Sequence, residues 1–176
     1  MPERIEITKM RENSANREYV IENVKLEGAL LEFASPELRD DKEVVLEAIE
    51  NNPEALEFAS DRLKGDRQVV YESVSKVGWT YCYAKENLLD DKELLLAGLK
   101  KSGQILYFAS SELRDDKEVV MEAVTNKPII IKYASGRLRE DKEIGLAAMN
   151  VNKNCYEFLG PNLKKDEEIL NIKNCT

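Results

Sequence analysis

Two stretches of this chain are nearly identical in sequence: "SPELRDDKEVVLEAI" at Ser35–Ile49 and "SSELRDDKEVVMEAV" at Ser110–Val124. They start 75 residues apart, and weaker versions of the same motif lie between them, so the underlying period is shorter. One leucine of the motif recurs every 25 residues, at Leu38, Leu63, Leu88, Leu113, Leu138 and Leu163. A fixed period of this length predicts an array of tandem structural repeats.

Two other positions keep the same register. Three residues after each leucine comes an aspartate, at Asp41, Asp66, Asp91, Asp116, Asp141 and Asp166. Five residues before each leucine comes an aromatic residue, at Phe33, Phe58, Tyr83, Phe108, Tyr133 and Phe158. A degenerate copy of the motif precedes these six, with Asn16 in the aspartate position. The sequence therefore predicts six clear units and one degenerate N-terminal unit.

The segment "DKEVVLEAIEN" at Asp41–Asn51 has the period of an amphipathic helix, with an apolar stripe formed by Val44, Val45, Ala48 and Ile49. Aspartate is a preferred N-cap residue, so we predict that the six recurring aspartates cap the long helices. Asp40 is an alternative cap, because Glu43 follows it at the spacing of a capping box.

A second, shorter helix is predicted from Pro53 to about Ser60, since proline suits the first turn of a helix. Leu56, Phe58 and Ala59 are its predicted packing residues. Each unit is then a helical hairpin whose apolar faces are covered only by neighbouring units.

The predicted fold is all-α, a right-handed α-solenoid of helical hairpins with a 25-residue period. Residues 1–12 form an N-terminal segment that is free to be flexible, and residues 13–176 form a single repeat domain. Solenoid ends are atypical, so Ile169, Leu170 and Ile172 are expected to stay partly exposed.

The repeated sequence motif resembles that of a known protein family. An aromatic-Ala-Ser group, then Leu-Arg-Asp-Asp-Lys-Glu-Val-Val, then a Glu-Ala-Val-like helix, resembles the uncharacterised repeat family called domain of unknown function 4116. The resemblance covers Phe33 to about Leu170 and is strongest at 33–49 and 108–124. It implies helical repeats, no known activity and no catalytic residues that could be carried over.

Charge and composition narrow the classes of function. The chain has 26 basic and 34 acidic residues, a net charge of -8, which disfavours binding to nucleic acid or to anionic membranes. The N-terminal "MPERIEITKMREN" lacks the continuous apolar stretch of a signal peptide. Three cysteines without paired spacing favour free thiols in a reducing compartment, so a cytoplasmic location is expected.

The residues of common active sites are missing. There is no histidine, which removes the most frequent general base and most zinc sites. Phosphate-binding glycine loops and CxxC pairs are also absent from the sequence. Paired acids such as Asp40 and Asp41 have the composition of a cation site, but helix capping explains them better. We therefore expect no enzymatic activity, no cofactor and no bound metal.

A basic residue stands two positions before the aspartate in five units, at Arg39, Lys64, Arg114, Arg139 and Lys164. We interpret this row as surface residues that pair with neighbouring acids, and an anion-binding edge is the alternative.

Positions that vary between units are the candidates for specific binding. On the short helices, helical spacing selects the slots of Glu54 and Glu57 in one unit as the outward face. In the next three units the same slots hold Trp79, Cys82, Gln104, Tyr107, Ile129 and Lys132. Tryptophan and tyrosine are frequent interface anchors, so these six residues are the predicted partner-binding positions, with burial in the core as the open alternative.

The sequence thus predicts a non-enzymatic scaffold that binds a protein or peptide. The alternative is a self-assembling element that associates, weakly, through its C-terminal end.

Overall fold

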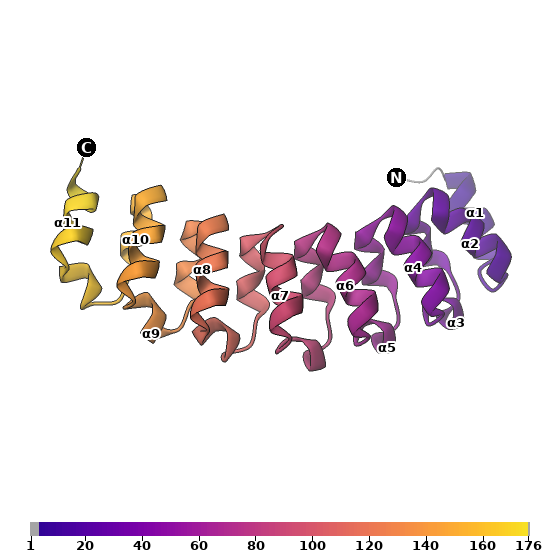
Figure 1. The fold of residues 1–176 in the computed structure, drawn as a ribbon. Coiled ribbons are helices and arrows are strands. Elements are labelled where there is room, and N and C mark those ends of the chain that lie inside the picture. The colour runs from indigo at the N-terminus through magenta and orange to yellow at the C-terminus, as the bar shows by residue number, and fades with distance from the viewer. Residues whose placement is uncertain (1–3, 176) are drawn as a thin grey trace. The chain divides into compact units, whose positions relative to one another are not determined.

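The computed structural model describes residues 4–175, and the side chains of residues 7–175. All regular elements in this range are helices, either α-helices or short 3-10 helices, and no described residue lies in a strand (Figure 1). The prediction of an all-α repeat fold is confirmed.

The chain divides into two compact units, with the boundary between Leu88 and Leu89. Unit 1 carries the long helices of the first three repeats, the degenerate one included, and unit 2 carries those of the following four, so the predicted repeat domain spans both units. Within each unit, the long helices that follow one another in the chain pack side by side (Figure 1).

Unit 1 contains ten elements: α1 (Arg4–Glu12), α2 (Arg17–Leu26), η1 (Gly28–Phe33), α3 (Pro36–Arg39), α4 (Lys42–Asn51), η2 (Pro53–Phe58), α5 (Asp61–Lys64), α6 (Arg67–Lys76), η3 (Gly78–Tyr83) and η4 (Glu86–Leu88). The labels η denote 3-10 helices. The segment 1–12, which the sequence leaves free to be flexible, contains helix α1.

Unit 2 contains the elements α7 (Lys92–Leu99), η5 (Gly103–Phe108), η6 (Leu113–Asp115), α8 (Lys117–Asn126), η7 (Pro128–Tyr133), α9 (Gly136–Arg139), α10 (Lys142–Val151), η8 (Lys153–Phe158), η9 (Leu163–Lys165) and α11 (Glu167–Asn174).

Each repeat has three helical pieces instead of the predicted two. The shorter helix is a six-residue 3-10 helix and ends at Phe58, before the predicted Ser60. A third, single-turn helix then carries the recurring leucine; in three repeats a serine hydroxyl caps it, as Ser60 does by accepting a hydrogen bond from the Leu63 amide at 3.2 Å. Sequence periodicity could not show this turn, because four residues are too few to define a helical period.

The core lies between the long helices and the 3-10 helices. In α4 the predicted stripe of Val44, Val45, Ala48 and Ile49 is fully buried. On η2, Ala55 and Leu56 are fully buried, but Phe58 is only half-buried, and Phe108 in the same slot is 41% exposed. The prediction that Phe58 is a core packing residue is therefore wrong, because its slot is the last of the 3-10 helix and lies at the edge of the core.

Helix α11 is better packed than predicted. Ile169 is fully buried, whereas Leu170 and Ile172 remain partly exposed as expected. The expectation for Ile169 is wrong, because this residue occupies the slot of Val44 in α4 and faces the preceding repeat.

All six recurring aspartates lie at the N-cap of a long helix, where each accepts hydrogen bonds from backbone amides. Asp41, for example, accepts from the amides of Glu43 at 3.0 Å and Val44 at 3.3 Å. Asn16 does the same for α2, with the Tyr19 amide at 3.2 Å. The degenerate unit thus keeps a working cap.

The cap aspartates also join neighbouring repeats. The side chain that directly follows one cap reaches the cap aspartate of the next repeat, as in Lys42 to Asp66 and Lys92 to Asp116, both at 2.8 Å. Arg17, Lys117 and Lys142 make the same connection to Asp41, Asp141 and Asp166. This ladder of ion pairs, spaced 24 residues along the sequence, fixes the register of adjacent long helices.

The acid that precedes the cap has a separate role. Asp40 accepts hydrogen bonds from the Ser60 hydroxyl and from Arg62 of the next repeat, and Asp115 does the same with Ser135 and Arg137. Asp40 is therefore not the cap of α4, and the capping-box alternative is wrong.

The ladder makes stability depend on pH. Although burial favours the neutral acid and is the largest single influence, the hydrogen bonds from Lys92 and from backbone amides together lower the pKa of Asp116. The pKa values of Asp66 and Asp141 are lowered by the same balance. A carboxylate with a lowered pKa in the folded state contributes stability that is complete above about pH 4, the ordinary aspartate pKa, and is lost as pH falls through the folded-state value.

We expect Asp116→Ala to lower the free energy of unfolding by about 1 kcal/mol at neutral pH, and by much less at about pH 3, in urea titrations followed by circular dichroism. Asp90→Ala, which removes an exposed acid that caps no helix, is the control and should change little at either pH. An equal loss for Asp116→Ala at both pH values would contradict the proposed contribution of the ionised cap.

Candidate binding surface

The six predicted binding positions lie on three 3-10 helices and none of them is buried. Tyr107 is 56% exposed and Trp79 is 39% exposed, while Gln104 and Lys132 are exposed and Cys82 and Ile129 are partly exposed. The 3-10 helices bury the side opposite to these residues, so the alternative that the six residues fill the core is wrong.

Trp79 and Cys82 belong to unit 1, on η3. The rings of Trp79 and Tyr83 meet edge to face, with centroids 5.4 Å apart, and the Tyr83 hydroxyl donates a hydrogen bond to Glu57 at 3.0 Å. Partial burial, and then the nearby Glu57 carboxylate, raise the pKa of the Cys82 thiol. A raised pKa keeps the thiol protonated and unreactive. The acidic and aromatic character of this part of the surface therefore comes from Glu57, Trp79 and Tyr83.

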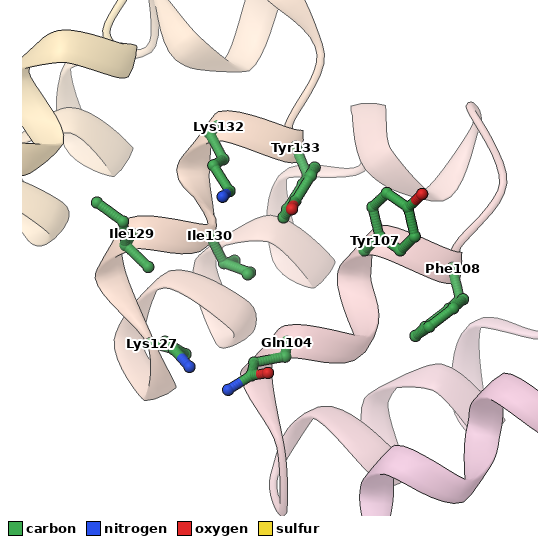
Figure 2. A pocket seen from close by; sticks show the side chains of 8 residues that line it. All are labelled: Gln104, Tyr107, Phe108, Lys127, Ile129, Ile130, Lys132 and Tyr133. Carbon is green, nitrogen blue, oxygen red and sulfur yellow. The ribbon is translucent and has the colours of Figure 1, made fainter.

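The other four positions belong to unit 2, on η5 and η7, where they line one hollow of about 280 Å³. Its lining side chains are Gln104, Tyr107, Phe108, Lys127, Ile129, Ile130, Lys132 and Tyr133. Figure 2 shows Lys132 and Tyr133 on one side of the hollow, with Gln104 and Lys127 on the opposite side. The structure therefore brings Gln104, Tyr107, Ile129 and Lys132 together.

Aromatic contacts hold the wall of this hollow. Tyr107 meets Tyr133 with ring centroids 5.0 Å apart and Phe108 at 5.1 Å, both edge to face. The Lys132 amine lies 4.8 Å from the centre of the Tyr133 ring. Edge-to-face rings of this kind stabilise one another, so Tyr107 is held in place while more than half of its surface remains open to a partner.

Sequence reasoning found four of the eight lining residues and missed Phe108, Lys127, Ile130 and Tyr133. Phe108 and Tyr133 occupy the recurring aromatic slot, in which Phe58 was predicted to pack in the core. Lys127 occupies the position before the 3-10 helix, where other repeats have Asn52, Val77, Ser102 and Asn152. Its variation between repeats was a signal that could have identified it.

The predicted row of basic residues is not a row of surface ion pairs. Its members are partly buried, and none of them forms an ion pair with an acid of the described chain. The Nε atoms of Arg39 and Arg139 are buried without a hydrogen-bond partner among the described residues. The interpretation of this row as paired surface residues is wrong; the ion pairs use other basic residues, among them Arg62, Arg137 and those that directly follow the caps.

A second and more open hollow, of about 540 Å³, lies on α4 and is lined by Lys42, Glu43, Leu46, Glu47 and Glu50. Four of these five side chains are charged, and it lacks the aromatic wall of the hollow on unit 2. Over residues 4–175 no group of three or more metal-ligating side chains comes together. No described helix has both the length and the apolar composition needed to cross a membrane.

The fold and the period define a protein of tandem helical repeats. The family described as Domain of unknown function (DUF4116) matches residues 16–64, 66–114 and 116–164, and the chain belongs to this family. Each match covers two 25-residue repeats and begins at an N-cap residue, Asn16, Asp66 or Asp116. Comparison with curated proteins and with solved structures finds no match.

Proposed function

We propose that this protein is a non-enzymatic scaffold that binds a protein or peptide partner through the exposed positions of its 3-10 helices. The observation that carries the proposal is the hollow on η5 and η7, whose lining includes Tyr107, Tyr133, Phe108 and Ile129, all of them at least partly exposed. Aromatic side chains that are held rigidly but remain exposed are typical of interface anchors.

The chemistry of the rest of the chain supports binding over catalysis. The sequence contains no histidine, and the acids that recur in every repeat are engaged as helix caps and ion-pair acceptors. The net charge of -8 supports a protein partner over nucleic acid or an anionic membrane. Free Cys82, Cys155 and Cys175 suit a reducing compartment, so the proposed location is the cytoplasm.

A displayed library of random peptides, selected on the full chain, tests the proposal. We expect enriched peptides whose binding to Tyr107→Ala is at least tenfold weaker, the loss of about 1.4 kcal/mol or more that is typical of an aromatic anchor. The measurement is fluorescence anisotropy with the selected peptides and with each variant shown by circular dichroism to be folded.

Tyr71→Ala is the matched control, because Tyr71 is also an exposed tyrosine, 42% exposed, but belongs to the long helix α6 and does not line the hollow. It should bind the selected peptides like the unmodified protein. If no peptide is enriched, or if Tyr71→Ala and Tyr107→Ala bind equally well, the proposal fails.

Self-association through α11 is the second candidate, and partly exposed Leu170 and Ile172 favour it. Glu167 opposes it, because this acid stands in the slot where the six earlier repeats carry Lys or Arg. A further repeat placed against α11 would bring its cap aspartate toward a like charge. A single mass at all concentrations in light scattering would remove this candidate.

A further inference from the structure

The charge of the hollow on unit 2 differs from that of the chain as a whole. Among the residues that the structure describes, Lys127 and Lys132 are the charged side chains that line it, and none of the lining side chains is a carboxylate. In the same slots, η2 has Glu57 where η7 has Lys132, and Glu54 where η7 has Ile129. The outward face of the 3-10 helices is therefore acidic at η2 and cationic at η7.

These two lysines are not neutralised by the protein. Lys92, Lys117 and Lys142 of the same unit each pair with two acids, but no ion pair within the described residues involves Lys127 or Lys132. The Lys132 amine lies over the Tyr133 ring, which leaves its charge available to a partner.

The size of the hollow limits the occupant to something small. Its volume of about 280 Å³ lies just below the range for ligand pockets, about 300 to 1,000 Å³, and its wall is mostly aromatic and aliphatic. Such a site accommodates one or two apolar side chains. A long polyanion would meet the many acids of the remaining surface, whereas a short segment would contact only the cationic hollow.

We propose that this hollow binds a short acidic peptide segment, with one aromatic or aliphatic side chain against Tyr107 and Ile129 and flanking carboxylates directed to Lys127 and Lys132. The inference rests on the proposed function and adds the class of partner to it. Opposite charges placed at the rim of an apolar contact select among partners more than they add affinity.

Three labelled peptides test the proposal by fluorescence anisotropy on the full chain. Each has one central phenylalanine, flanked on both sides by glutamates in the first, by lysines in the second and by serines in the third. We expect the glutamate peptide to bind most tightly, and we expect added salt to weaken its binding most.

The Lys127→Gln/Lys132→Gln variant should bind the glutamate peptide about 3- to 30-fold more weakly, the effect of losing two exposed charge contacts. Lys100→Gln/Lys101→Gln is the matched control, because both lysines are exposed on unit 2 but do not line the hollow. This control removes the same charge and should bind within about twofold of the unmodified protein.

Tighter binding of the serine or lysine peptide would overturn the acidic specificity but leave the proposed function intact. An equal loss in the two double variants would also overturn it, because the attraction would then be diffuse. If a DNA oligonucleotide or an anionic vesicle binds through Lys127 and Lys132 while the glutamate peptide does not, the partner class is wrong. Failure of all three peptides together with an empty library selection would overturn the proposed function as well.

Discussion

Replacing Leu56 with alanine is expected to lower the free energy of unfolding by about 2 to 5 kcal/mol, the range for truncating a buried leucine. Leu56 is 0% exposed, and η2, which carries it, packs against both α4 and α6. The cavity would open between two long helices that belong to successive repeats. Because an array of repeats is stabilised by contacts between neighbours, the loss affects two interfaces.

Urea unfolding followed by circular dichroism measures this effect. Leu26→Ala is the control, because Leu26 is 81% exposed and the same truncation should then change the free energy of unfolding by less than about 0.5 kcal/mol. Equal effects of the two substitutions would show that η2 is not part of the core.

The second large effect is expected for Gly28→Ala, at about 1 to 3 kcal/mol of lost stability, because the added methyl group overfills a closed space. A Cβ atom at Gly28 would overlap the backbone carbonyl oxygen of Ala48 and come within 2.9 Å of the Asn52 Cβ. The Gly28 amide also donates a hydrogen bond to the Asn51 side chain at 2.8 Å, which holds η1 close to α4. A Cβ atom at Gly103, in the same slot three repeats later, would likewise meet the Ala123 carbonyl oxygen at 2.8 Å, whereas the next repeat has Pro53 in this slot.

Gly136→Ala provides the comparison, because nothing lies within 4 Å of a Cβ placed there. Gly136 begins α9 with a negative φ, so alanine should leave stability unchanged or raise it by about 0.4 to 1 kcal/mol. A Gly28→Ala protein as stable as Gly136→Ala would show that η1 and α4 do not approach so closely.

The 25-residue period and the long helices follow from the sequence, because ten residues such as Lys42–Asn51 are enough to define an apolar stripe and a cap. The 3-10 geometry does not follow from the sequence, since a six-residue helix such as η2 covers too little sequence to separate a period of 3.0 from one of 3.6. The sequence likewise could not show that Phe58 would be only half-buried, because the end of so short a helix is not placed closely enough by its pattern.

Half of the residues that line the candidate site were predicted from the sequence. Variation between repeats identified Tyr107 and Lys132 as exposed, but the hollow also needs Tyr133 and Phe108, whose recurrence in every repeat concealed them. The ion-pair ladder was missed for a related reason. Lys42 and Asp66 lie 24 residues apart, and their contact becomes visible only when successive repeats are placed side by side.

Residue-resolved NMR on the full chain, titrated with a peptide selected from the library, shows where the partner binds. We expect the amide signals that shift on binding to belong to η5 and η7, with Gln104, Tyr107, Ile129 and Lys132 among them, and we expect the shifts to disappear in Tyr107→Ala. Shifts confined to the long helices, or unchanged in that variant, would contradict the claim that the exposed face of the 3-10 helices binds the partner.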